Sequence, residues 1–560
     1  MRRSTNALVP VVRDDEDAER HQGRVDGVVS TLTPEPSAST PPRVKAHSSA
    51  GQIRGSSMLL VGRLLSLGTN FVVHVLIVRH LSADYGAFAY ALSLVSLAET
   101  VVTLGLDRAV TRFVPIFEER GEQSKLRGTL LLVLGAVTSL GLGVVLLTFG
   151  LQGVITGTLI NDRQAVSLLL ILVFLAPIQA LDTVSIGLFA VFARPGAIFL
   201  RRYVLAPGLR LVVVLLLVLG GSGATFLAVG YVAAGALGCL VYLGVLYRAL
   251  RKSGVIGPGG MRGISVPFRE VLSFTLPLLT SDLVYTVMHT SDVIMLGYYS
   301  GTAEVGAFRA VQPAARLNHL VMSSFALLFM PLAARLFARQ DRDGINALYW
   351  HTAMWLGVLS FPVFALTFAL AEPLTVTLFG AAYADSAVYL SLLSLGYYVQ
   401  AASGFNGLAL KAIGHVRYIV VINLAAAILN IAANLLLIPR YGALGAAIGT
   451  LGAMLVHNLL KQLGLRGTGI QLLQREAVRV YLVVASAIAA LVAMQQLLEP
   501  PLLIGVPLAA VASLFVLAVA RPCLQVDAVF PELLRFGIMR KLIGAPEPAS
   551  RRDRSPQRGP

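Results

Sequence analysis

The sequence predicts an all-α integral membrane protein with about fourteen transmembrane helices, arranged as two pseudo-symmetric six-helix lobes followed by two C-terminal helices. Apolar residues fall into blocks of about twenty, the length that crosses a hydrocarbon core of about 30 Å. Only 13% of the residues are charged, whereas soluble domains have about 25%. Because strands in lipid leave backbone groups unpaired, blocks of this length are expected to be helices.

The apolar blocks are bounded by charges and turn residues, which set the expected spans. They lie at 57–79, 87–106, 129–150, 165–190, 203–220, 225–247, 271–297, 311–333, 348–370, 387–410, 418–438, 443–463, 477–498 and 502–520. The expected divisions are a disordered cytoplasmic tail (1–56), an N-terminal lobe (57–250), a C-terminal lobe (251–465), helices 13 and 14 (466–520) and a cytoplasmic tail (521–560).

The N-terminal tail does not resemble a signal peptide, because it mixes acidic residues with prolines and contains no apolar stretch. The two cysteines, Cys239 and Cys523, provide neither a disulfide framework nor metal-ligand spacing, so we expect no metal and no cofactor. The net charge of +16 is explained by membrane topology rather than by nucleic-acid binding.

Loop charges orient the chain. One set of loops has 21 arginines and lysines between Arg108 and Arg475, and the alternate set has four, Arg79, Arg163, Arg309 and Arg440. Since cytoplasmic loops are rich in Lys and Arg, the first set is expected in the cytoplasm. The expected location is therefore the plasma (inner) membrane, with both termini cytoplasmic.

An internal repeat supports two lobes. Tyr85-Gly86-Ala87-Phe88 resembles Val305-Gly306-Ala307-Phe308, which lies 220 positions later. Gly187-Leu188 and Gly407-Leu408 have the same offset. Repeats in the same orientation predict lobes related by an axis along the membrane normal, with a substrate cavity between them.

Several of these segments resemble the polysaccharide-transporter flippases. This family belongs to the superfamily that also holds the multidrug and toxin extruders and the lipid II flippases. The resemblance covers about residues 55 to 465. It rests on segments 76–86 (LIVRHLSADYG), 103–108 (TLGLDR), 292–297 (DVIMLG), 304–306 (EVG), 378–383 (LFGAAY), 438–442 (IPRYG) and 445–447 (GAA).

The resemblance implies a function. Members of the family move polyprenyl-diphosphate-linked oligosaccharide from the inner to the outer leaflet for surface-polysaccharide biosynthesis, and alternating access is the expected mechanism. The implied partners are the lipid-linked glycan, membrane lipid and polysaccharide polymerase or assembly proteins. Coupling of transport to a H⁺ or Na⁺ gradient is also consistent with membership of this superfamily.

Polar residues within the spans mark the expected cavity, because an ionisable group at mid-bilayer costs about 2.5–3.5 kcal/mol unless it faces a cavity or a partner. Helical spacing aligns Arg309, Gln312, Arg316, His319 and Ser323 on one face of the eighth span. The candidate cavity residues are Arg63, Asn70, Glu99, Arg210, Asp282, Tyr285, His289, Arg316, Asn423 and Asn430.

Arginine is suited to the diphosphate because its planar fork of donors matches phosphate oxygens. Arg63, Arg210 and Arg316 are therefore the expected head-group ligands, and Asn and Tyr suit sugar hydroxyls. Structural roles stay open for other residues. Asp292 and Arg309 fit the outer interface, Asp107 and Arg108 fit an ion pair, and the Asn residues fit interhelical hydrogen bonds.

Enzyme signatures are missing from the sequence. It has no Walker motif, no H-E-x-x-H and no G-x-S-x-G, and Asp341-Arg342-Asp343 fits a solvated charge cluster. We therefore expect a transporter and not an enzyme.

Three alternatives to a polysaccharide flippase remain. One is a cation-coupled multidrug antiporter that uses Glu99, Asp182 or Asp282; the others are a lipid II flippase and a non-transport scaffold.

Overall fold

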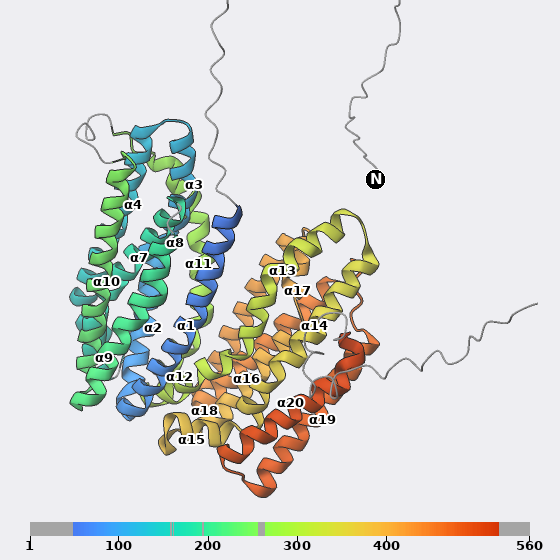
Figure 1. The fold of residues 1–560 in the computed structure, drawn as a ribbon. Coiled ribbons are helices and arrows are strands. Elements are labelled where there is room, and N and C mark those ends of the chain that lie inside the picture. The colour runs from blue at the N-terminus through green and yellow to red at the C-terminus, as the bar shows by residue number, and fades with distance from the viewer. Residues whose placement is uncertain (1–48, 157–159, 161, 193–194, 256–263, 526–560) are drawn as a thin grey trace, which may run out of the picture. The chain divides into compact units, whose positions relative to one another are not determined.

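The computed structural model describes residues 49–156, 160, 162–192, 195–255 and 264–525. Within these residues all regular secondary structure is helical, which confirms the predicted class (Figure 1). The first helix begins at Ser49, before the expected start of the first span at residue 57. The predicted tails otherwise lie almost entirely outside the described residues.

The first half of the chain supplies ten helices in the described residues. They are α1 (Ser49–Leu81), α2 (Tyr85–Thr103), α3 (Leu106–Glu119), α4 (Gln123–Gly150), α5 (Gln152–Val154), α6 (Arg163–Leu172), α7 (Leu175–Val191), α8 (Pro195–Phe199), α9 (Ala206–Gly220) and α10 (Ala224–Lys252). A 3₁₀ turn, η1 (Ser82–Asp84), joins α1 to α2, and a π-helical turn, η3 (Leu200–Leu205), precedes α9.

The second half continues in the same way. Its helices are α11 (Phe268–Tyr299), α12 (Thr302–Arg316), α13 (Asn318–Ala338), α14 (Arg342–Phe364), α15 (Ala371–Phe379), α16 (Ser386–Ala402), α17 (Asn406–Ala412), α18 (Val416–Gly464), α19 (Arg475–Leu498) and α20 (Leu502–Leu524). A π-helical turn, η4 (Ala365–Ala369), follows α14, and a 3₁₀ turn, η5 (Ala381–Tyr383), precedes α16.

The helices account for the predicted spans. Among the described residues, ten helical segments are long and apolar enough to cross a membrane, or up to eleven when the bent pair in α13 is taken as one span. Two of the ten, Val61–Glu119 and Val416–Gly464, each hold two predicted spans. The second of these is divided at Gly442, whose φ of 54° is not helical. The predicted tenth span corresponds to α16 with α17.

The predicted eighth span, 311–333, has the wrong boundaries. Helix α12 begins at Thr302, and the chain passes into α13 at Leu317. Pro313 and Pro331 lie inside these two helices. Since proline lacks a backbone N–H and clashes with the preceding turn, it favours such breaks, which an apolar block does not reveal.

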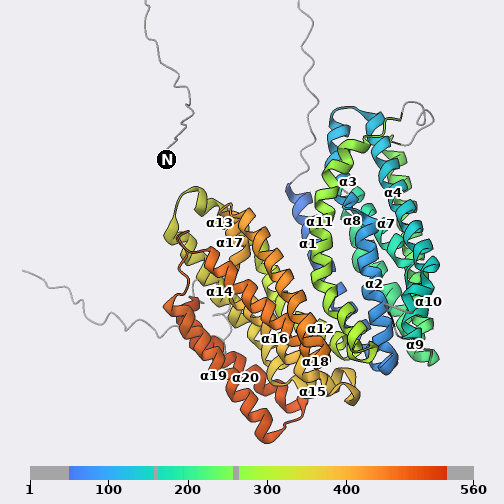
Figure 2. The ribbon, with the colours of Figure 1, turned by 180° about the vertical axis from the view of Figure 1, so that it is seen from behind.

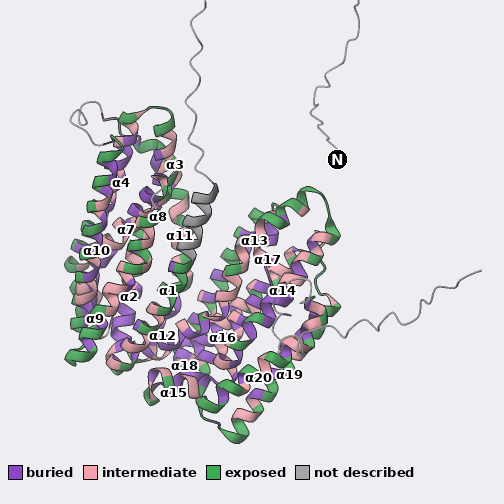
Figure 3. Cartoon of the chain, viewed as in Figure 1, coloured by how far each residue is buried: buried purple, intermediate pink, exposed green. Residues whose placement is uncertain are grey.

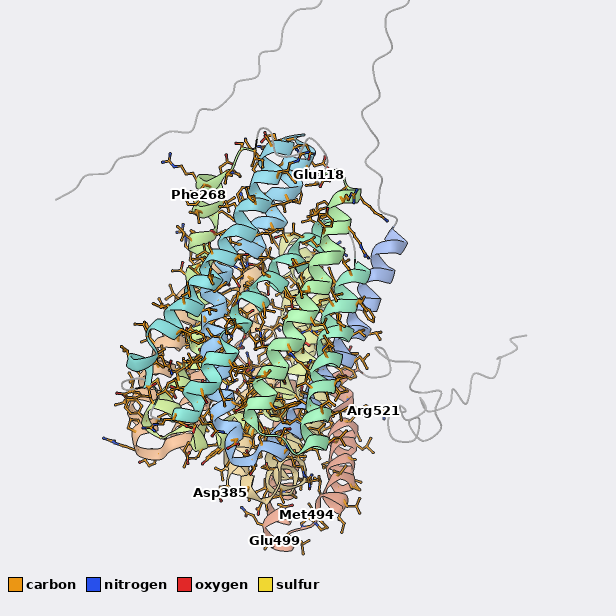
Figure 4. The ribbon with its side chains drawn as sticks, turned by 90° about the vertical axis from the view of Figure 1, so that its left-hand side faces the viewer. Glu118, Phe268, Asp385, Met494, Glu499 and Arg521 are labelled. Atoms are coloured by element: carbon orange, nitrogen blue, oxygen red, sulfur yellow. The ribbon has the colours of Figure 1, made fainter. Side chains whose placement is uncertain are left out.

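Loops that the charge pattern assigns to opposite sides of the membrane lie at opposite ends of the helices. Glu118 and Phe268 lie at one end, and Asp385, Met494 and Glu499 lie at the other (Figure 4). We call these the Glu118 end and the Asp385 end. The loops predicted to be cytoplasmic include those next to Glu118 and Phe268.

The buried apolar residues form two clusters. One combines the first half with α11, α12 and parts of α16 and α18, and the other joins α13, α14, α17, α19 and α20. Helix α14 is among the most buried helices (Figure 3). In an apolar 18-residue stretch of the segment Arg342–Ala369, which contains α14, 72% of the residues lie inside the protein. Helices α19 and α20 pack on α14 and so extend the second half.

Helix α11 connects the halves. It packs along α2 and α3 of the first half and along α18 of the second (Figure 2). Thr100 of α2 and Thr286 of α11 share a hydrogen bond of 3.0 Å.

Close to the Asp385 end, α2 and α12 touch through their backbones. A Cβ atom on Gly86 would overlap the carbonyl oxygen of Thr302, and one on Gly306 would lie 3.1 Å from the Cα atom of Gly86. Tyr383 also donates a hydrogen bond to the Ser82 carbonyl at 2.7 Å. The repeat-related glycines therefore meet each other at the contact between the two halves.

Replacing Gly86 by alanine should weaken this contact, because overpacking a close helix crossing costs about 1–3 kcal/mol. The thermal unfolding midpoint of the purified chain in detergent should fall. Gly68→Ala is the matched control, since a Cβ atom there meets nothing within 4 Å. Equal midpoints for the two variants would contradict a backbone contact at Gly86.

Candidate functional site

Arg309 lies partly buried between the halves. Its Nη1 donates to Gln312 Oε1 at 2.7 Å, and its Nη2 donates to Ser93 Oγ of α2 at 3.0 Å. Asp292 of α11 is 4% exposed and within electrostatic range of Arg309. Neighbouring helices thus cover Asp292 and part of Arg309, and the place of the two residues at the outer interface stays a prediction.

Three cations act electrostatically on His319. Arg63 of α1, Arg316 of α12 and Lys461 of α18 all lie within electrostatic range of the His319 ring on α13. We call these four residues the cationic cluster. They come from four helices and from both halves of the chain.

The cations of this cluster are not neutralised by ion pairs. Among the described residues, none of the ion pairs involves Arg63, Arg316 or Lys461. Arg316 donates from Nε to the Tyr397 hydroxyl at 3.1 Å and remains exposed. Asp292 lies within electrostatic range of Arg316 and also of Arg309. The surface between the halves is therefore positive.

A second charged group lies inside the first half. Asp182 of α7, Arg201 of η3 and Arg210 of α9 line a cavity of about 30 Å³, and Glu99 of α2 lies within electrostatic range of Arg210 and Asp182. We call these four residues the N-half tetrad. A volume of this size holds about two water molecules, so the cavity does not fit a glycan.

The tetrad depends on local backbone structure. The π-helical turn η3 directs Arg201 inward, where its side chain is 7% exposed and forms an ion pair with Asp182. Gly238 of α10 leaves room for the guanidinium, because a Cβ atom there would lie 2.8 Å from Arg201 Cζ. Arg210 lies over the Tyr231 ring, 5.6 Å from its centroid. Within the tetrad, Arg201 is thus paired with a carboxylate, and Arg210 lies over an aromatic ring.

The structure separates Arg210 from the other two expected head-group ligands. Arg63 and Arg316 lie in the cationic cluster, whereas Arg210 and Glu99 lie in the N-half tetrad. Helical periodicity places residues on a face of their own helix, but it does not say which neighbour covers that face.

The polar face of α11 contains three predicted residues. Asp282 forms an ion pair of 2.6 Å with Arg108, so the expected pairing of Asp107 with Arg108 is replaced by a contact between α3 and α11. Tyr285 and His289 are exposed, and their rings contact each other in a tilted arrangement with the centroids 4.2 Å apart.

The predicted asparagines mainly make contacts within or between neighbouring helices. Asn70 donates to the Ser66 carbonyl of its own helix at 2.7 Å. Asn430 is buried and accepts from Asn434 at 3.4 Å. Asn423 contacts His457 Nε2 at 2.8 Å and remains exposed.

Sequence reasoning missed Lys461, Arg201 and Tyr397 as site residues. The two cations had been assigned to cytoplasmic loops. Their position at the ends of apolar blocks gave no sign that Lys461 extends along Gly407 or that Arg201 turns inward. Among the described residues, no group of three His, Cys, Asp or Glu side chains is arranged to hold a metal ion.

Comparison with known families identifies the chain. The family model described as polysaccharide biosynthesis protein matches residues 53–337, just over half of the chain. The chain belongs to this family. A second family model, MatE, matches residues 277–436 of this polysaccharide biosynthesis protein.

Two curated relatives are similar to parts of this polysaccharide biosynthesis protein. The succinoglycan biosynthesis transport protein ExoT of Rhizobium meliloti (strain 1021) is 25% identical over 335 residues, which cover 59% of this chain and 63% of ExoT. The capsular polysaccharide biosynthesis protein CapF of Staphylococcus aureus is 25% identical over 184 residues, 32% of this chain and 46% of CapF. The chain thus spans less than two thirds of either relative.

Solved structures share the fold. The lipid II flippase MurJ in an inward closed conformation has a TM-score of 0.63 at 15% identity, covering 86% of this chain and all of MurJ. An inward-facing multidrug resistance MATE family transporter of the MOP superfamily has a TM-score of 0.56 at 15% identity, covering 78% of this chain and 98% of its own. The fold is therefore that of a multi-pass helical membrane transporter.

Removing one partner of the buried ion pair should be costly. Asp182→Leu leaves Arg201 unpaired, and an unpaired buried charge destabilises by about 3–5 kcal/mol. The unfolding midpoint in detergent should fall clearly. The double variant Asp182→Leu with Arg201→Met should recover most of the loss, because both charges are then removed.

The variant Asp282→Leu shows the effect of removing one partner of a more exposed ion pair. The Arg108 and Asp282 side chains of that pair are 46% and 29% exposed. Pairs of this exposure contribute less than about 1 kcal/mol. Equal losses for Asp182→Leu and Asp282→Leu would show that the Asp182 pair is not buried in the folded protein.

Proposed function

We propose that this polysaccharide biosynthesis protein is a flippase. It moves polyprenyl-diphosphate-linked oligosaccharide from the inner to the outer leaflet by alternating access between its halves, 57–250 and 251–465, with helices of 466–520 added to the second half. The cationic cluster is the observation that carries this proposal.

The cluster fits a diphosphate head group by its charge and by the donors of its arginines. Each unpaired cation within the membrane costs about 2.5–3.5 kcal/mol on insertion scales. An anionic ligand that binds between Arg63, Arg316 and Lys461 offsets that cost. Arginine also matches phosphate oxygens with parallel donors, whereas a neutral sugar offers no charge to balance the site.

Contacts between the halves support alternating access. His74 of α1 contacts the Ala310 carbonyl of α12 at 2.8 Å, and Arg79 donates to the Thr377 carbonyl at 3.2 Å. With Gly86 and Tyr383, these contacts lie toward the Asp385 end. The cationic cluster lies farther along the same helices toward the Glu118 end. This arrangement suits a transporter that loads its cargo from the Glu118 side.

The comparisons favour the same substrate class. ExoT is a transport protein of succinoglycan biosynthesis, and MurJ is a lipid II flippase. We infer that surface-polysaccharide assembly proteins act on the delivered glycan, and that the chain itself carries out no catalysis.

A H⁺ or Na⁺ gradient is the proposed energy source. Glu99 supports this, because its carboxylate makes no ion pair among the described residues and lies within electrostatic range of Arg210 and Asp182, which line the small N-half cavity. The transport assay below separates the two ions when it is run with each gradient in turn. Transport that is unaffected by both gradients would contradict coupling.

Neutralising the cationic cluster should slow transport. In proteoliposomes with a fluorescent polyprenyl-diphosphate disaccharide, Arg316→Gln and Lys461→Gln should each lower the flipping rate about tenfold, since a charge-assisted hydrogen bond contributes about 1.5–3 kcal/mol. The double variant should lower it further. Arg339→Gln, an exposed arginine at the end of α13, is the control and should flip at the wild-type rate.

Wild-type rates in the Arg316 and Lys461 variants would contradict the head-group site. If the wild-type protein moves a fluorescent multidrug-type cation and does not move the glycolipid, the antiporter alternative is supported instead.

The loop charges predict that the Glu118 end faces the cytoplasm of the plasma membrane. A cysteine introduced at Arg339 in a chain lacking Cys239 and Cys523 should react with a membrane-impermeant maleimide only after cells are permeabilised. A cysteine at Glu499 should react in intact cells, because it lies at the opposite end (Figure 4). The reverse pattern would overturn the assigned orientation.

A further inference from the structure

An aromatic pair lies exposed in the middle of α11. Tyr285 is 64% exposed, and its ring contacts that of His289 in a tilted arrangement, with the centroids 4.2 Å apart and the planes at 32°. His289 Nδ1 contacts the Tyr285 carbonyl at 2.9 Å, which holds the two side chains on one side of the helix. Rings that serve only to pack against neighbouring helices are covered, and these are not.

The pair faces the space between the halves and not the lipid. Asp282 and Asp292 lie on the same face of α11, one helical step before Tyr285 and one after His289. Carboxylates at this depth do not face hydrocarbon. Arg316 lies within electrostatic range of both Tyr285 and His289, so the aromatic pair borders the cationic cluster.

The chemistry of the pair suits a sugar ring. An aromatic ring offers an apolar face to the C–H groups of a pyranose, while the Tyr285 hydroxyl and the His289 nitrogens can bond to its hydroxyls. The Tyr397 hydroxyl, which accepts from Arg316, adds a further polar group next to that arginine. Two aromatic rings with polar edges thus lie within electrostatic range of Arg316.

We propose that Tyr285 and His289 form a binding platform for the first sugar of the cargo, the residue attached directly to the diphosphate. The inference rests on the proposed function, because the cationic cluster positions the diphosphate next to the platform. The platform makes the protein sensitive to the presence of that sugar, whereas the cations bind the charge common to all such lipids.

Binding of two matched lipids tests the platform. The full chain in nanodiscs is titrated with a polyprenyl diphosphate that carries one hexose and with the same lipid without sugar. Tyr285→Ala should weaken binding of the hexose lipid about tenfold, the effect of losing one aromatic contact of about 1.4 kcal/mol. Binding of the sugar-free lipid should be unchanged.

Tyr285→Phe keeps the ring and should retain most of the affinity for the hexose lipid. Tyr298→Ala is the matched control, because Tyr298 is an exposed tyrosine at the end of the same helix. It should bind both lipids as the wild type does.

Two outcomes would overturn the platform while leaving the proposed function intact. One is an equal loss for both lipids in Tyr285→Ala, and the other is wild-type binding of both lipids in that variant. If the wild-type protein binds neither lipid, the proposed function fails and the platform fails with it.

Discussion

The backbone contact between α2 and α12 is the constraint on which the arrangement of the two halves depends. Hydrophobic burial does not draw helices together inside lipid, so close packing and hydrogen bonds must do so. Gly86 and Gly306 allow the two helices to approach without intervening side chains. Ser93 then comes within reach of Arg309, and His74 within reach of Ala310. The polar groups between the halves are positioned by this approach.

The structure handles charge in two different ways. Inside the first half, Arg201 and Asp182 form an ion pair, and Glu99 and Arg210 lie within electrostatic range of each other. Between the halves, Arg63, Arg316 and Lys461 make no ion pairs among the described residues. Because unpaired charge is unfavourable in the membrane, the first arrangement contributes to a stable fold and the second favours a bound anion.

Much of the architecture could be predicted from the sequence, because block length and loop charge report directly on the membrane. The repeat could be found as well, and its glycines lie where the halves meet. The site was harder to predict. Periodicity placed Arg210 and Arg316 on polar helix faces but did not show that different helices cover them. Arg201 and Lys461 have the spacing of loop residues, and the inward direction of Arg201 depends on a π-helical turn and on the space beside Gly238.

The N-half tetrad has no charged counterpart in the second half. At the repeat offset of 220, the positions matching Glu99, Asp182 and Arg210 are His319, Ala402 and Asn430. The two halves therefore differ at these matching positions. The first half holds charged side chains there, and the second holds a histidine, a methyl group and an amide. A chain with two copies of one scaffold can change the chemistry of one copy while the other keeps a different task. In this protein the symmetry of the backbone thus supports an asymmetric division of labour among its side chains.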